Sequence, residues 1–383
     1  MNRLRNKFAT LAAALVLGTA CSTGTTTPDA SPLGSAPATG TPTAGESEGT
    51  APEGLGAIVF NSFGVLSTID ADGTNERVIH ESWDGIGMSA DGKTFFSPLP
   101  AADGRLAPLI LPTDGSGEEW LAVTDPTLNF GIGDWSPDSA RLVLDAWDDT
   151  DATRKGLYTV ALDGSDLVRL TEAGGGHDWP AYTGTYSPTG DRILFFRTAD
   201  ETDSDGVAMN LFVVNTDGTG LLQLNPPETT TALRGPSGVS SWSPDGTQVV
   251  FVATDGDWAT EPRAVFIAGT DGEPAQRITD WGDILTAQWS PDGQRIAMTM
   301  LDGGEHQIFT VRPDGSDVTP ITSTDDGTFC FGAMWSPDSS QLLYLRGTEL
   351  RSSMDLWVSN ADGTNPMQIT DSSSEIGGYE WVP

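Results

Sequence analysis

The residues best suited to ligand chemistry lie outside the repeated patterns of this sequence. Three glycines at 174–176 precede His177, Asp178 and Trp179. Other irregular segments contribute Arg234, Trp258, Arg263 and Trp281. Tryptophan and arginine carry much of the binding energy at interfaces. We therefore predict that these seven residues contact a ligand. The structural alternative is a long linker whose Trp179 packs against the rest of the fold.

No catalytic signature accompanies these residues. The chain contains no Gly-x-Ser-x-Gly elbow, no phosphate loop and no His-Glu-x-x-His pattern. His80, His177 and His306 belong to different repeats, and no spacing requires them to share a metal. We therefore predict no catalytic residue and no required cofactor.

Two acidic groups interrupt the repeats and offer oxygen ligands. One group comprises Asp145, Asp148, Asp149 and Asp151. The other is similar to the start of a calcium loop, but its twelfth position is Phe212 where Glu is usual. Its candidate calcium ligands are Glu201, Asp203 and Asp205. The alternative is that all these acids are simply solvated.

The charge balance excludes whole classes of partner. The 383 residues contain 19 Lys and Arg against 54 Asp and Glu, a formal net charge of −35. Nucleic-acid binding depends on neutralising phosphates with Lys and Arg, so it is excluded. Attraction of a basic patch to anionic lipid is excluded for the same reason.

The N-terminus has the layout of a secretory signal. Arg3, Arg5 and Lys7 precede ten largely apolar residues at 8–17, a stretch too short to span a bilayer as a helix. The following Gly-Thr-Ala-Cys, which ends at Cys21, resembles the bacterial lipoprotein signal, although Gly18 stands where Leu is usual. This resemblance implies that Cys21 is lipidated after removal of residues 1–20. An ordinary cleaved signal peptide is the alternative.

A low-complexity segment follows the signal. Residues 22–54 are rich in Thr, Ser, Pro, Gly and Ala, a composition that cannot bury enough apolar surface to order itself. We predict that residues 21–56 are a disordered tether and that residues 57–383 form the folded domain. The second of the two cysteines, Cys330, is flanked by Phe on both sides and is predicted to be a buried small hydrophobe.

Internal repeats predict the fold. A Trp-Ser-Pro-Asp-Gly-like half recurs every 46 to 56 residues, at 135–139, 186–190, 242–246, 289–293 and 335–339, with a degenerate copy at 88–92. A second half carries an Asp-Gly turn, at Asp72, Asp114, Asp163, Asp217, Asp271, Asp314 and Asp362. Repeats of this length built from short strands indicate an all-β propeller. The C-terminal strand would complete the first of seven four-stranded blades; six blades are the alternative.

These motifs resemble the TolB-type, WD40-like β-propeller repeat of bacterial secreted proteins, over about residues 57–383. The resemblance implies the propeller fold but no activity. TolB proteins carry an additional α/β domain before the propeller, and a tether stands in that place here. Propellers of the oligopeptidase kind are joined to a hydrolase domain, for which this sequence has no room.

The repeats also predict two unlike faces. The Ser-Pro-Asp-Gly and Asp-Gly turns should share one face, the turn face, where the aspartates serve as turn formers. The connections between second and third strands and between blades should share the other, the loop face, where function concentrates. We expect a monomeric, lipid-anchored, extracytoplasmic module of the bacterial cell envelope. It would bind a protein, peptide or glycan without catalysis. The alternative is a polysaccharide lyase or glycosidase with its site at the channel mouth.

Overall fold

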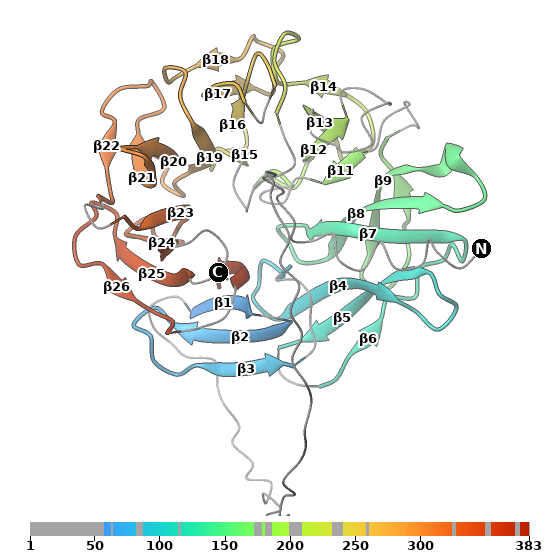
Figure 1. Ribbon diagram of the computed structural model, residues 1–383. Helices are drawn as coiled ribbons and strands as arrows, with labels where there is room; N and C mark the ends of the chain where they lie inside the picture. The colour runs from blue at the N-terminus through green and yellow to red at the C-terminus, as the bar shows by residue number, and fades with distance from the viewer. Residues whose placement is uncertain are drawn as a thin grey trace, which may run out of the picture. The chain divides into compact units, whose positions relative to one another are not determined.

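The computed structural model describes residues 57–382, apart from residues 63, 82–86, 114–115, 172–177, 181–185, 199–208, 232–239, 258–259, 324–326, 349–353 and 372–375. The described strands form six four-stranded sheets and one three-stranded sheet, all antiparallel. These sheets follow one another around a ring (Figure 1). The fold is a seven-bladed β-propeller, as the repeats predicted, and the six-blade alternative is wrong.

Each blade runs from an innermost strand near the ring axis to a short outermost strand. Blade 1 contains β27 (Ile376–Trp381), β1 (Ala57–Ser62), β2 (Val65–Asp70) and β3 (Arg77–His80). Blade 2 contains β4 (Thr94–Pro100), β5 (Leu106–Pro112) and β6 (Glu119–Trp120), and a bridge from Met88 to Phe95 stands for its innermost strand. Blade 3 contains β7 (Leu128–Trp135), β8 (Arg141–Asp148), β9 (Gly156–Ala161) and β10 (Val168–Arg169).

The remaining four blades have the same order. Blade 4 contains β11 (Asp178–Pro180), β12 (Arg192–Thr198), β13 (Met209–Asn215) and β14 (Leu222–Gln223). Blade 5 contains β15 (Ser240–Trp242), β16 (Gln248–Ala253), β17 (Ala264–Gly269) and β18 (Gln276–Arg277). Blade 6 contains β19 (Ile284–Trp289), β20 (Ile296–Asp302), β21 (Glu305–Val311) and β22 (Thr319–Pro320). Blade 7 contains β23 (Phe329–Trp335), β24 (Gln341–Gly347), β25 (Met354–Asn360) and β26 (Met367–Gln368).

The C-terminal strand closes the ring. β27 pairs with β1 in antiparallel register, with Phe60 opposite Tyr379 and Ile58 opposite Trp381. Trp381 is 5% exposed and packs in one apolar cluster with side chains of blade 7. The pairing removes two sheet edges that would otherwise be exposed. The predicted closure is confirmed.

Three of the tryptophans that end an innermost strand join neighbouring blades by the same hydrogen bond. The indole N–H of Trp135 donates to the Gly87 carbonyl at 3.0 Å, and that of Trp335 donates to the Gln288 carbonyl at 3.3 Å. Trp381 repeats the contact with Met334 at 3.2 Å. In each case the acceptor is the residue just before the repeated motif of the preceding blade, which begins with Met88, Trp289 or Trp335. The indole therefore provides a directional bond in addition to apolar area.

The motif aspartates shape the turn face, as predicted. The Asp217 carboxylate accepts from the Thr219 amide at 2.9 Å and from its hydroxyl at 2.6 Å. Asp314 binds Ser316 in the same way. These bonds, from the hydroxyl first and then the amide, lower the pKa of both carboxyls below 3.8. The carboxylates are thus turn ligands for their own backbone.

Several predicted loop residues lie in strands. Asp145 and Asp148 belong to β8, which extends to Asp148, so the acidic insertion begins later than expected. Asp178 and Trp179 belong to β11, the innermost strand of blade 4, and not to an interblade linker. Strand pairing extended both segments beyond what local composition suggested. Cys330 in β23 is fully buried, as predicted. No helix in the described part of the chain is long and apolar enough to cross a membrane.

Candidate ligand site on the loop face

The junction of blades 5 and 6 brings three polar side chains together on the loop face. Arg263 directly precedes β17, Asp283 directly precedes β19, and His306 is the second residue of β21. The Arg263 backbone exchanges two hydrogen bonds with Gly282, of 2.6 and 2.8 Å. The Leu301 amide donates to the Asp283 carbonyl at 2.9 Å, which fixes the linker to blade 6 as well. Rigid strands therefore position all three residues.

The centre of this site is an arginine–carboxylate pair. The Arg263 guanidinium is ion-paired with the Asp283 carboxylate, and its side chain is only 11% exposed. Burial lowers the pKa of Arg263. Removing Arg263 would therefore leave the Asp283 carboxylate without this ion pair.

His306 lies beside that pair in its neutral form. Its Nε2 is 3.9 Å from the Asp283 carboxylate, beyond hydrogen-bond distance. Burial first, and then the charge of Arg263, lower the pKa of His306 below 6.5, against an opposing effect of Glu305. Neither ring nitrogen has a hydrogen-bond partner among the described residues. Both nitrogens are buried, so the imidazole keeps one donor and one acceptor unsatisfied inside the blade junction.

Trp281 adds an aromatic surface next to this site. It lies in the same linker, two residues before Asp283, and is 36% exposed. The guanidinium of Arg277 lies 5.1 Å from the indole centroid, and Phe266 meets the indole edge-on at 6.0 Å. We name Arg263, Trp281, Asp283 and His306 the junction site. It combines an aromatic surface with hydrogen-bonding groups, a composition suited to recognition.

Most of the other predicted ligand residues cannot be placed around the junction site. His177, Arg234 and Trp258 lie outside the described residues, as do Cys21 and the candidate calcium ligands Glu201, Asp203 and Asp205. Sequence reasoning included Arg263 and Trp281 but missed Asp283, which no motif marks. It considered His306 only as a possible metal ligand. In the described part of the chain, no group of three or more His, Cys, Asp or Glu residues could hold a metal ion.

Part of the first acidic group has a structural partner. Arg154, in the 3-10 turn η1 (Ala152–Arg154), donates to Asp148 at 2.9 Å and also binds Asp125 and Thr127. Hydrogen bonds from Thr150, and to a smaller extent from Thr127 and Arg154, hold the pKa of Asp148 far below its usual value. An internal cation therefore already neutralises charge at this end of blade 3.

Comparison with known proteins identifies the repeats. Residues 221–376 match the family model described as the TolB beta propeller domain. This segment resembles a TolB-type propeller. Among curated relatives of the chain, an uncharacterized protein of Agrobacterium fabrum is 26% identical over 223 residues, which is 55% of this chain and 67% of the relative. Dipeptidyl-peptidase 5 of Porphyromonas endodontalis is 31% identical over 116 residues, 29% of this chain. The chain thus spans only 16% of that relative.

Solved structures agree with the propeller fold. Puromycin hydrolase has a TM-score of 0.57 at 15% identity, over 83% of this chain and 53% of its own. Oligogalacturonate lyase with manganese has a TM-score of 0.54 at 15% identity, over 77% and 82%. The propeller of the Pyrococcus furiosus Trilobed protease has a TM-score of 0.53 at 12% identity, over 80% and 87%. That propeller is described as having an open velcro topology, whereas β27 and β1 pair here. At these identities the likeness shows the fold alone.

Proposed function

We propose that this chain is a lipid-anchored, extracytoplasmic propeller of the bacterial cell envelope that binds a protein, peptide or glycan without catalysis. The junction site is the observation that supports this proposal. Its neutral His306 has two buried ring nitrogens without a hydrogen-bond partner among the described residues, in the same blade junction as the exposed Trp281. Rigid strands hold the group in place, so a ligand would bind without the cost of ordering it.

Affinity capture from envelope extract tests this function. The bait is the full chain, and the comparison bait carries Trp281→Ala together with His306→Ala. We expect a ligand that the parent retains and the double variant loses. Identical capture by both baits would remove the junction site from the proposal.

The two faces of the disc should respond differently to substitution. Trp281→Ala removes exposed aromatic area, so we expect at least tenfold weaker binding of the captured ligand, with a small change in melting temperature. Asp217→Ala and Asp314→Ala remove turn bonds on the other face. We expect lower melting temperatures and binding within twofold of the parent. Titration calorimetry and thermal melting measure both quantities; the opposite pattern would assign binding to the turn face.

Cys21 is expected to anchor the protein to the membrane. Cys21→Ser removes the acylation site, so the protein should move from the membrane fraction to the soluble fraction. Cys330→Ser is the matched control. Cys330 is buried in β23, so its substitution should leave the protein in the membrane fraction. A full-length Cys21→Ser protein that stays with the membrane would contradict the anchor.

A glycosidase or lyase is the second candidate, and one observation favours it. Glu380 and Asp134 each precede the motif tryptophan on an innermost strand, in blades 1 and 3. Burial first, and then the charge of Asp134, raise the pKa of Glu380 to about 8, so this carboxyl is protonated at neutral pH. A protonated acid near a second carboxyl is a pattern found in glycoside hydrolysis. Release of reducing ends from oligosaccharides by the parent, but not by Glu380→Gln, would support this candidate.

A further inference from the structure

One blade junction lacks a contact that the other described junctions share at this turn. In most of the described Asp-Gly turns, the glycine packs directly against a backbone carbonyl of the preceding blade. A methyl group added to the glycine would lie within 3.4 Å of that oxygen at Gly73, Gly164, Gly218, Gly315 and Gly363. The corresponding Gly272 of blade 5 has no neighbour within 4 Å. The turn of blade 5 therefore stands away from blade 4.

A pocket opens at this gap. It has a volume of about 380 Å³ and lies between the outermost strand of blade 4 and the turn that precedes β18. We name it the rim groove. Its apolar lining comprises Leu222, Leu224, Pro226, Pro227, Pro274 and Ala275. A volume of this size accommodates two or three small amino-acid residues of a ligand.

The blade 4 wall of the rim groove is held rigidly. Asn225 is 2% exposed, and its Oδ1 accepts from the Leu211 amide at 2.8 Å. Its Nδ2 donates to the Thr229 carbonyl at 2.6 Å and to Asn210 at 3.0 Å. The Thr229 hydroxyl donates to the Pro226 carbonyl at 2.9 Å. The groove is therefore formed before any ligand arrives.

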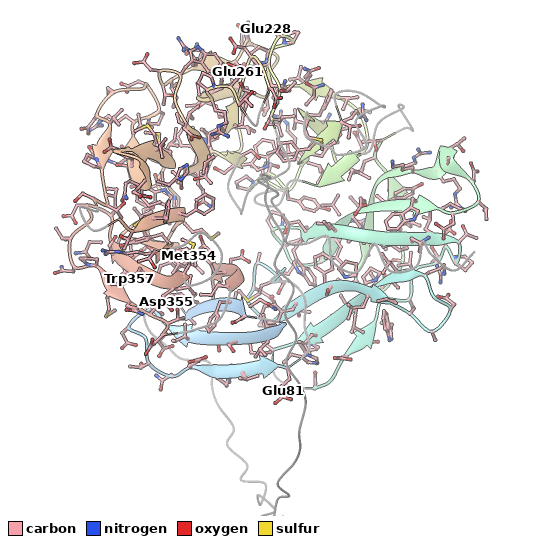
Figure 2. The ribbon with its side chains drawn as sticks, in the orientation of Figure 1. Glu81, Glu228, Glu261, Met354, Asp355 and Trp357 are labelled. Atoms are coloured by element: carbon pink, nitrogen blue, oxygen red, sulfur yellow. The ribbon has the colours of Figure 1, made fainter. Side chains whose placement is uncertain are left out.

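The charge of the rim groove favours a cationic occupant. Glu228 and Glu273 line it and are both exposed, and neither has an ion pair among the described residues. No Lys or Arg lines the groove. Figure 2 shows Glu228 at the outer edge of the ring, in the sector of β14 and β18. With a net charge of −35 on the chain, this surface attracts a positive side chain and repels an acidic one.

The lining also distinguishes a peptide from a sugar. No aromatic side chain lines the rim groove, so no flat surface is present for stacking against a sugar ring. β14 is the last strand of its sheet, and no other described strand pairs with its outer edge. Such an edge can accept an extended peptide through main-chain hydrogen bonds, with pockets selecting the side chains.

We propose that the rim groove binds an extended peptide segment of a partner protein, with a lysine or arginine held by Glu228 and Glu273. A small apolar residue next to that cation occupies the space beside Leu222 and Ala275. This site is separate from the junction site, so either can fail without the other.

Capped tetrapeptides provide the test. The series Ac-Ala-Xaa-Val-Ala-NH2, with Lys, Gln or Glu at Xaa, is titrated into the isotopically labelled chain and followed by amide chemical shifts. We expect the Lys peptide to bind at least tenfold more tightly than the Gln peptide, with shifts confined to residues 222–228 and 269–275. The Glu peptide should not bind. Shifts elsewhere, or equal binding of all three peptides, would overturn the proposal.

Matched variants separate charge from shape. Glu228→Gln with Glu273→Gln should weaken the Lys peptide at least tenfold, whereas Glu261→Gln, in the same sector of Figure 2 and outside the groove lining, should leave it within twofold. Ala275→Phe fills the groove and should abolish binding while the melting temperature stays near that of the parent. Unchanged binding of the Lys peptide to the Glu228→Gln, Glu273→Gln double variant and to Ala275→Phe would show that the rim groove is not the binding site. Binding of a neutral oligosaccharide such as cellotetraose, without binding of the Lys peptide, overturns the ligand class.

Discussion

Deleting the last twelve residues, 372–383, should destabilise the propeller more than any single substitution. The deletion removes β27, which pairs with β1 and supplies Ile376, Tyr379 and Trp381 to the apolar cluster shared with blade 7. It also removes the Tyr379 hydroxyl bond to the Gly332 carbonyl, at 2.5 Å. Loss of one buried tryptophan alone costs about 3–5 kcal/mol. We therefore expect the deleted protein to be unfolded at 37 °C, or to melt at least about 10 °C below the parent.

Two further measurements show that strand closure is responsible. Trp381→Phe keeps the strand and most of the apolar contact but loses the indole bond to Met334, so it should cost only about 1–2 kcal/mol. A synthetic peptide of residues 372–383 should raise the melting temperature of the deleted protein in a concentration-dependent way. A deleted protein that melts within a degree or two of the parent would show that closure does not hold the ring.

Glu380→Gln should stabilise the protein at pH 8 and leave its stability unchanged at pH 4. The carboxyl has a pKa near 4.5 when unfolded and about 8 when folded, because burial and then Asp134 oppose its ionisation. Between these values the unfolded state has lost the proton and the folded state has kept it, so rising pH favours unfolding. A full shift of this size corresponds to about 5 kcal/mol at 1.36 kcal/mol per pKa unit. Because the Glu380 side chain is partly exposed, water reduces this effect. We therefore expect Glu380→Gln to raise the free energy of unfolding at pH 8 by about 2 kcal/mol.

Denaturant unfolding at pH 4, 6 and 8 measures this effect. The control is Asp134→Asn, which removes the second cause of the raised pKa and should make the gain from Glu380→Gln at pH 8 smaller. A stability difference between Glu380→Gln and the parent that is the same at pH 4 and pH 8 would show that this carboxyl does not titrate as described.

The repeats alone were sufficient to predict the fold, because each of them encodes local structure. A Ser-Pro-Asp turn with a neighbouring aromatic residue, and an Asp-Gly turn between apolar runs, specify hairpins within a few residues. Counting the halves predicted seven blades, and the unmatched strand at residues 379–383 predicted the closure that β27 and β1 make. The limits of β8 and β11 were less predictable, since pairing with a neighbouring strand determined them.

The sites depended on contacts that sequence spacing does not encode. Arg263, Asp283 and His306 are separated by 20 and 23 residues and meet only because two blades pack side by side. The charge of Asp134 in blade 3 raises the pKa of Glu380 on the last strand of the chain, although the two residues are far apart in the sequence. The rim groove exists because one turn, at Gly272, stands away from the preceding blade while its counterparts pack closely. Local turn chemistry determined the hairpins of each blade. The packing of the blades around the ring determined which side chains of different blades come into contact.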